Sequence, residues 1–270
     1  MGEPTGSAAA PVGSDRVLAV LTELARRPAG IGLDELARTV DSPKPTVHRA
    51  LAALRRAGFA SQNGRGHYQL GDEFIRLAFS NYEARPDHLR VQPILEELAE
   101  RFAETAHYAV LEDRSVVYRA KVDPSVGAVK LTSTIGGRSP AHSTAVGKVL
   151  LAYRLPDDDA VRDWVSAGPL NARTERTRTS AAQLAPELAL IRERGFGTED
   201  QENEPGISCL AVPIFLGSPN IPSGAISVSA LTYRTPLATL IDDLPAVIGI
   251  VERWCEPVTR VGVKPFDVKP

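Results

Sequence analysis

The chain has 270 residues, of which 43% are hydrophobic and 24% are charged, and its formal net charge is -2. This composition is typical of a water-soluble protein with room for two domains. No apolar run approaches the roughly 18 residues that span a bilayer, and residues 1–13 lack the basic and apolar regions of a signal peptide. We therefore expect a cytoplasmic protein with no membrane partner, in which residues 1–13 form a flexible tail.

Metal and cofactor chemistry find little support in the sequence. Cys209 and Cys255 lie far apart, and the five histidines are scattered along the chain. These spacings match neither a disulfide framework nor a usual set of metal ligands. The glycines form no phosphate-binding loop and no dinucleotide-binding fingerprint. We expect no metal, no cofactor and no catalytic residues.

The basic residues are concentrated in one segment. Between Asp41 and Asp72 the chain contains no acidic residue. The five cations of this segment are Lys44, Arg49, Arg55, Arg56 and Arg65. Without them the chain has 26 basic and 33 acidic residues, a net charge of -7. Such segregation is typical of a surface that binds nucleic-acid phosphates, although from charge alone a solvated basic face is the alternative.

Three helices are expected before and within this basic segment. Apolar residues between positions 17 and 24 recur at helical spacing, with Ser14 as the N-cap. The segment LDELARTV (33–40) predicts a second, short helix. In a third helix Val47, Leu51 and Leu54 share one face, and the two prolines at positions 43 and 45 fit only its first turn. The opposite face of the third helix is polar and free to enter a DNA groove.

Two short strands follow in FASQNGRGHYQLG (59–71), around the Asn63-Gly64 turn signal. Three helices and a hairpin form a winged helix-turn-helix, in which the third helix enters the major groove and the wing contacts the backbone or the minor groove. A small helical adaptor is the alternative. We expect Thr46, His48 and Arg49 near bases or adjacent phosphates, and Lys44, Arg55 and Arg65 mainly on phosphates.

The rest of the chain predicts a linker helix and an α+β domain. Helical spacing continues over residues 72–85, breaks near Pro86 and resumes from Val91 to Phe102. Strands are expected at residues 107–113, 115–122, 128–133, 207–215 and 225–231, with helices at 146–155, 159–165, 184–194 and 238–256. These elements place the second domain at residues 86–256, followed by a tail at 257–270.

Two of these strands alternate in a way that suggests a binding pocket. Ile207, Cys209 and Ala211 share one face of the first strand, and Ser227 and Ser229 share one face of the second. A cavity lined by hydroxyls and a thiol suits a small organic ligand, and the first turn of a helix that opens within residues 143–148 favours a carboxylate. A solvated face of an antiparallel sheet is the alternative for the two serines.

The segment TVHRALAALRRAGFASQNGRGHYQLG (46–71) resembles the N-terminal domain of the IclR family of bacterial transcription regulators. IGGRSPAHSTAVGKVLLA (135–152), GFGTEDQENEPGISCLAVPIF (195–215) and GAISVSAL (224–231) are similar to segments of that family's effector domain. The resemblance implies a GAF- or profilin-like second domain and a linker helix that contributes to dimerisation. Pro45 departs from the serine that is common in the family. The implied effector-site positions are Ala145, Val146, Glu199 or Asp200, Cys209, Ser227 and Ser229.

These features together predict a ligand-responsive transcriptional regulator. One winged domain covers only a half-site, so we expect a homodimer or homotetramer on near-palindromic, double-stranded operator DNA. The effector is expected to be a small metabolite, with a carboxylate or aromatic acid favoured. An enzyme that uses Cys209 as nucleophile with His107 or His142 as base is the alternative. No nucleophile or metal motif supports that alternative, and a thiol in an apolar strand is usually inert.

Overall fold

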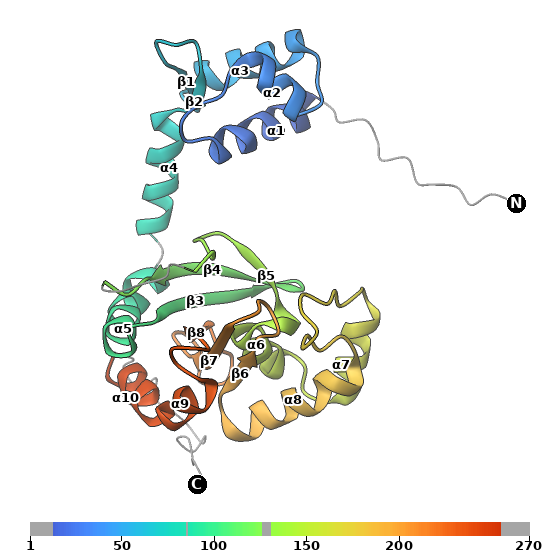
Figure 1. Ribbon diagram of the computed structural model, residues 1–270, viewed down its shortest axis with the longest axis vertical. Coiled ribbons are helices and arrows are strands. Elements are labelled where there is room, and N and C mark those ends of the chain that lie inside the picture. The colour runs from blue at the N-terminus through green and yellow to red at the C-terminus, as the bar shows by residue number, and fades with distance from the viewer. Residues whose placement is uncertain (1–12, 85, 126–130, 255–270) are drawn as a thin grey trace, which may run out of the picture. The chain divides into compact units, whose positions relative to one another are not determined.

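The computed structural model describes residues 13–84, 86–125 and 131–254 (Figure 1). The chain divides between residues 85 and 86 into two compact units, which are described separately below. Of the expected tails at residues 1–13 and 257–270, residues 1–12 and 257–270 lie outside the described residues, whereas Gly13 is the first residue of a helix. Within the described ranges, no helix is both long enough and apolar enough to span a membrane.

The first unit is a helical domain with a two-stranded wing. Its elements are α1 (Gly13–Arg26), α2 (Leu33–Thr39), α3 (Lys44–Arg56), β1 (Ala60–Gln62), β2 (Tyr68–Leu70) and α4 (Asp72–Glu83). The first three helices and the wing enclose one core, which includes Val20, Leu24, Leu36, Leu51 and Tyr68. β1 and β2 pair antiparallel. The winged helix-turn-helix expected from the sequence is therefore confirmed.

The start of α3 tolerates two prolines because neither removes a helical hydrogen bond. Pro43 is the N-cap residue and Pro45 lies in the first turn, where the backbone nitrogen has no intrahelical acceptor. The Pro43 carbonyl accepts from the N–H groups of Thr46 and Val47, at 2.9 and 3.1 Å. At the first helix the expectation was wrong: α1 begins at Gly13, so Ser14 lies inside the helix and is not its N-cap.

The second unit is built on a six-stranded antiparallel sheet in the order β5-β4-β3-β8-β7-β6. The strands are β3 (Thr105–Glu112), β4 (Ser115–Val122), β5 (Arg138–Pro140), β6 (Gly197–Asp200), β7 (Ile207–Ile214) and β8 (Gly224–Leu231). The central strands set the positions that matter below. His107 on β3 pairs with Ser227 on β8, and Ser229 on β8 pairs with Cys209 on β7.

Helices cover both faces of this sheet (Figure 1). One face packs against α5 (Pro86–Phe102), α9 (Leu237–Asp242) and α10 (Leu244–Trp254). The other face packs against α6 (Ala145–Arg154), α7 (Asp158–Ser166) and α8 (Ala181–Arg194). The alternation in β7 follows from this arrangement, since Leu210 and Val212 enter the first core and Ala211 enters the second. The expected α+β fold is confirmed.

Three local expectations differ from the structure. Residues 128–130 of the strand expected at 128–133 lie outside the described residues, and residues 131–133 are not in a strand. The two edge strands, β5 and β6, were not expected, because three or four residues are too few to display a period of two. The single helix expected at 238–256 is divided at Asp243 into α9 and α10.

Candidate functional sites

The polar face of α3 is exposed opposite its buried face. Val47, Leu51 and Leu54 are buried in the core of the first unit, whereas His48 and Arg49 are exposed and Thr46 is half-buried. Neither His48 nor Arg49 has an ion pair or a hydrogen bond from its side chain within the part of the chain that the structure describes. Both side chains are therefore available to an external partner.

Two other cations of the basic segment already have protein partners. Lys44 Nζ forms an exposed ion pair with Asp34 at 2.9 Å. Arg55 Nη1 donates to Gln62 Oε1 of the wing at 3.2 Å. An exposed ion pair contributes little free energy, so a phosphate can replace Asp34 as the partner of Lys44 at small cost. These two residues differ in this respect from Arg49.

The tip of the wing is a turn that exposes Arg65. Asn63 Oδ1 accepts from the backbone N–H groups of Arg65 and His67, at 3.1 and 3.0 Å. Gly66 has a φ of +80°, a left-handed conformation that favours glycine. The Arg65 side chain lies on the surface at the end of this turn. The asparagine and glycine thus fix the position from which Arg65 projects.

The second unit contains a pocket of about 240 Å³ at the N-terminus of α6. The predicted positions that line it are Ala145, Val146, Glu199, Cys209, Ser227 and Ser229. Asp200 does not line it, which corrects that expectation. Its carboxylate instead pairs with Arg176 and accepts from Ser208 Oγ at 3.1 Å. Adjacent strand residues face opposite sides, so Glu199 and Asp200 cannot share the pocket.

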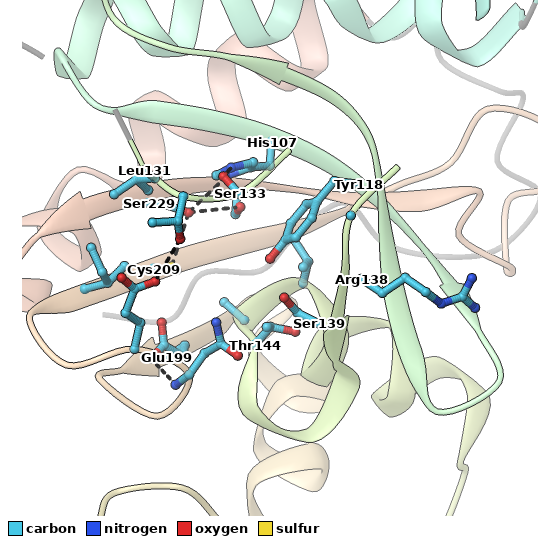
Figure 2. A pocket seen from close by; sticks show the side chains of 18 of the residues that line it. His107, Tyr118, Leu131, Ser133, Arg138, Ser139, Thr144, Glu199, Cys209 and Ser229 are labelled. Carbon is cyan, nitrogen blue, oxygen red and sulfur yellow. Dashed lines mark hydrogen bonds between the residues drawn. The ribbon is translucent and has the colours of Figure 1, made fainter. Parts of the chain in front are cut away.

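A chain of hydrogen bonds crosses the sheet side of the pocket (Figure 2). Cys209 Sγ donates to Ser229 Oγ at 3.2 Å, and Ser229 Oγ lies 3.2 Å from His107 Nδ1. His107 Nε2 lies 2.7 Å from Ser133 Oγ. Ser227 and Ser229 are buried, so the alternative of a solvated serine face is wrong.

His107 is a pocket residue that the sequence did not predict as an effector contact. Burial, with a smaller contribution from the positive charge of Lys121, lowers its pKa to about 3. At neutral pH His107 is therefore uncharged. A neutral imidazole has one donor nitrogen and one acceptor nitrogen, and His107 uses them to link Ser133 and Ser229. The signal that could have identified it is the pairing of β3 with β8, which places His107 opposite Ser227.

Arg138 lines the pocket but its guanidinium is directed elsewhere. Figure 2 shows this side chain extending away from Tyr118 and Ser139. Arg138 Nη1 donates to Glu112 Oε2 at 3.0 Å. Its positive charge is therefore partly neutralised by Glu112 and does not face the hydrogen-bonded chain of His107.

Glu199 is the buried carboxyl group of the pocket. It is 1% exposed, and its Oε1 accepts from the backbone N–H of Glu202 and from that of Asn203, the latter at 3.1 Å. Burial raises the pKa of Glu199 to about 7, against the opposing effect of the Asn203 hydrogen bond. Near neutral pH this group can therefore either accept or donate a hydrogen bond in the pocket.

The first turn of α6 supplies hydrogen-bond donors to the same pocket. The Thr144 side chain caps the helix by accepting from Gly147 N–H at 3.2 Å. The N–H groups of Ala145 and Val146 have no acceptor within the helix, and both residues line the pocket. Together with the helix dipole they favour an anionic or strongly polar ligand group. A Cβ at Gly147 would lie 2.2 Å from the Ala141 carbonyl oxygen, which explains the glycine.

Replacing Glu199 by glutamine is expected to change how stability depends on pH. The pKa of Glu199 is raised from 4.5 to about 7, so its favourable contribution is complete below about pH 4.5 and is lost as pH rises through 7. Between pH 4.5 and pH 8, the free energy of unfolding of the wild type should therefore fall by about 3 kcal/mol more than that of Glu199→Gln. Urea unfolding followed by the fluorescence of Trp164 and Trp254, both in the second unit, measures this difference. Equal pH dependence in both proteins would contradict it.

Both units match models of one protein family. The IclR helix-turn-helix domain matches residues 14–64, and the bacterial transcriptional regulator IclR C-terminal domain matches residues 88–256. The HTH-type transcriptional regulator KdgR of Escherichia coli K12 is 37% identical over 187 residues, which cover 68% of this chain and 70% of KdgR. The transcriptional repressor IclR of the same strain is 31% identical over 237 residues, which cover 87% of this chain and 83% of the repressor.

A solved structure has a similar fold. It is an IclR homologue from Microbacterium hydrocarbonoxydans complexed with 4-hydroxybenzoate, with a TM-score of 0.71 and 23% identity. The match covers 87% of this chain and 97% of the homologue, and at this identity it shows the fold alone. The chain belongs to the IclR family of transcriptional regulators, which are not enzymes, and combines a helix-turn-helix DNA-binding domain with a C-terminal effector domain.

Proposed function

We propose that this regulator binds a near-palindromic operator as a dimer or dimer of dimers, and that a small metabolite in the second unit changes its operator affinity. The observation that carries the proposal is the exposed basic face of α3 and the wing, in a chain whose remaining residues have a net charge of -7. The acidic remainder is repelled by DNA, so this face is the one expected to bind it. Such a regulator acts in the cytoplasm.

The exposed residues of α3 are proposed to read bases, and the flanking cations to bind phosphates. The side chains of Arg49 and His48 are exposed and make no hydrogen bond or ion pair within the described residues. They lie on the third helix, which in a winged helix-turn-helix enters the major groove. With Thr46 they can reach base edges or adjacent phosphates. Phosphate contacts are assigned to Lys44, Arg55 and Arg65, which surround that helix in the acid-free segment.

Exposed apolar side chains on α1 and α4 support dimerisation. Leu18 on α1 is 61% exposed and Phe79 on α4 is 60% exposed, with Ile75 and Leu77 also on the surface of α4. A second copy would remove these side chains from water, and two-fold symmetry would present two recognition helices to two half-sites. Sedimentation equilibrium of the full chain tests this: a monomer at micromolar concentration would contradict it.

The proposed effector is a small acid, with aromatic acids included. A pocket of about 240 Å³ is large enough for a compact metabolite, and the free N–H groups of Ala145 and Val146 suit a carboxylate. The buried hydroxyl groups of Ser227 and Ser229, which line the pocket, offer hydrogen bonds to a hydroxyl group of the effector. The related protein from Microbacterium hydrocarbonoxydans that is complexed with 4-hydroxybenzoate makes this acid a reasonable first candidate.

The effector is proposed to act by linkage through α4, within the 72–85 connector. A ligand that binds one arrangement of the dimer more tightly shifts the population toward it and so changes the spacing of the two recognition helices. The direction of that change decides whether the effector releases operator DNA or strengthens binding. In either case, operator and effector must alter each other's affinity by the same factor.

Selection from a library of random DNA duplexes tests the proposed function. The full chain should enrich a sequence with two-fold symmetry, because each winged domain covers one half-site. Half-sites separated by one or more helical turns would agree with a dimer. Failure to enrich any sequence at physiological salt would contradict sequence-specific binding. The enriched duplex, called the selected operator below, then serves in all binding measurements.

Replacing Arg65 by alanine is expected to weaken all DNA binding without changing sequence preference. The wing-tip side chain is exposed and is assigned to a phosphate, so its loss removes one counterion-releasing contact. The slope of log affinity against log salt should fall by about one. Fluorescence anisotropy between about 50 and 200 mM salt measures the slope on the selected operator and on an unrelated duplex. An unchanged slope on both would remove Arg65 from the interface.

A further inference from the structure

A cluster of buried charges lies directly behind the pocket. Lys148, one turn along α6 from the pocket-lining Thr144 and Ala145, is fully buried. Its Nζ lies 2.6 Å from Glu202 Oε1 and 3.5 Å from Glu187 Oε1. A buried lysine must pair with an acid, because taking an ammonium out of water without a partner is costly. The nearer of these acids, Glu202, connects the cluster to the pocket.

Two arginines complete the cluster. Arg178 Nη1 lies 2.5 Å from Glu202 Oε1, and its Nη2 lies 3.4 Å from Glu187 Oε2. Arg194 Nη2 lies 3.6 Å from Glu187 Oε1. The cluster thus holds three cations and two acids. Lys148 and Arg178 both contact the same carboxylate oxygen, Oε1 of Glu202. The other oxygen, Oε2, is buried and has no hydrogen-bond partner within the described residues.

Glu202 also holds the pocket carboxyl through its backbone. It lies in the loop between β6 and β7, and its N–H donates to Glu199 Oε1. The next residue, Asn203, donates its N–H to the same oxygen at 3.1 Å and lines the pocket. The Asn203 side-chain oxygen accepts from Ser143 Oγ at 3.1 Å. One loop therefore carries the buried anchor and the groups that orient Glu199.

The carbonyl groups of this loop are held by a neighbouring segment. Thr174 Oγ1 donates to the Gln201 carbonyl, and Thr177 Oγ1 donates to the Glu202 carbonyl, each at 2.6 Å. Gln201 has a φ of +58°, an unfavourable conformation for a residue with a side chain. The loop is thus kept in one strained conformation by contacts on both its side-chain and its backbone groups.

Stability alone does not account for such a cluster. Buried ion pairs can often be replaced by apolar residues of similar volume with no loss of stability, because desolvation offsets most of their attraction. The unsatisfied Oε2 of Glu202 adds to that cost. What the ion pair provides that an apolar pair would not is a directional link between α6 and the loop that carries Glu199.

We propose that Lys148 and Glu202 are positioning residues of the effector pocket: their ion pair holds the 201–206 loop so that its backbone amides fix the Glu199 carboxyl toward the bound effector. This inference rests on the proposed function, since it assigns the pocket to effector binding. Neither residue contacts the effector directly, and both act through Glu199.

The thiol of Cys209 offers a test that does not require the effector. Cys209 lines the pocket, and burial raises its pKa well above the usual value, so it reacts slowly in the intact pocket. Replacing Cys255 by serine leaves Cys209 as the single thiol. In that background, the rate of alkylation of the full chain by iodoacetamide, followed by mass spectrometry, reports how well the 201–206 loop, whose Asn203 and Glu204 line the pocket, shields the thiol.

We expect Lys148→Met to raise the alkylation rate of Cys209 at least about tenfold, because the loop loses its anchor. The isosteric Glu202→Gln should act similarly, and it serves if Lys148→Met does not fold. The double variant should react about as fast as the faster single variant, since each substitution alone already breaks the Lys148–Glu202 ion pair. The matched control is Val212→Ala, which opens a cavity in the other core of the same unit.

The outcomes separate this inference from the proposed function. Alkylation at the wild-type rate in both Lys148→Met and Glu202→Gln, or at the rate of Val212→Ala, would overturn the positioning role. Because no effector is present, a failure of the effector assignment does not alter these rates. A wrong effector assignment is detected separately, by a Cys209→Trp variant whose response to the effector is unchanged although its indole occupies the pocket.

Discussion

Arg49→Ala will weaken binding to the selected operator by roughly 10- to 100-fold and will reduce discrimination between that operator and its base-pair variants. The Arg49 guanidinium is exposed on the polar face of α3 and has no partner within the described residues. Arginine contacts guanine edges with two hydrogen bonds, so its loss removes both affinity and base preference. Fluorescence anisotropy with single-base-pair operator variants measures both effects.

The matched control for Arg49 is Arg162→Ala. Arg162 is also exposed, but it lies on α7 of the second unit and pairs with Asp159. Its removal should leave operator affinity unchanged within about twofold, since it lies outside the basic segment. Equal affinity of wild type and Arg49→Ala for the selected operator would mean that α3 does not read bases, and the assignment of the recognition helix would then be wrong.

Cys209→Trp will abolish the response to an effector and leave operator affinity intact. The Cys209 side chain lines a pocket of about 240 Å³, and an indole at that position occupies the space that a small acid needs. The residues proposed to bind DNA belong to the other unit, so operator binding without effector should be unchanged. Anisotropy of the operator complex, titrated with a panel of small acids that includes 4-hydroxybenzoate, measures the response.

Cys209→Ser is the matched control for the pocket. Serine keeps the size of the side chain and its hydrogen bond toward Ser229, so the response should persist. The tryptophan variant must also retain the unfolding midpoint of the second unit within a few degrees, as judged by tryptophan-independent circular dichroism. A full effector response in Cys209→Trp would show that the effector binds elsewhere.

Local pattern was sufficient to predict the DNA-binding unit. Its three helices and its wing lie within one segment of about 60 residues, and the buried positions Val47, Leu51 and Leu54 recur at helical spacing. The charges were harder to interpret. The pairing of Lys44 with Asp34 depends on how α2 packs against α3, which no periodicity in the sequence reports.

The pocket could be predicted only in part, because it depends on contacts between distant segments. Alternation and family resemblance identified Cys209, Ser227 and Ser229, but neither resolved which of Glu199 and Asp200 faces the pocket. That choice is set by the register of β6 against β7, and β6 is too short to display it alone. The contact of His107 likewise requires the pairing of β3 with β8.

Lys148 illustrates what a sequence pattern conceals. A lysine in the middle of a helix is usually exposed, yet this one is fully buried. Its partner Glu202 follows 54 residues later, in a loop between two strands. Only the packing of α6 against β6 and β7 brings the two charges together, so the positioning role proposed for them required the three-dimensional structure.

The ratio of affinities for the selected operator and for a scrambled duplex of the same composition tests the central claim most directly. At physiological salt, the full chain should prefer the selected operator by at least about a thousandfold, as sequence-specific regulators do. The preference should persist as salt is raised, whereas binding to the scrambled duplex should decline steeply. Equal affinity for both duplexes would mean that the basic face binds DNA through charge alone, and would contradict this account.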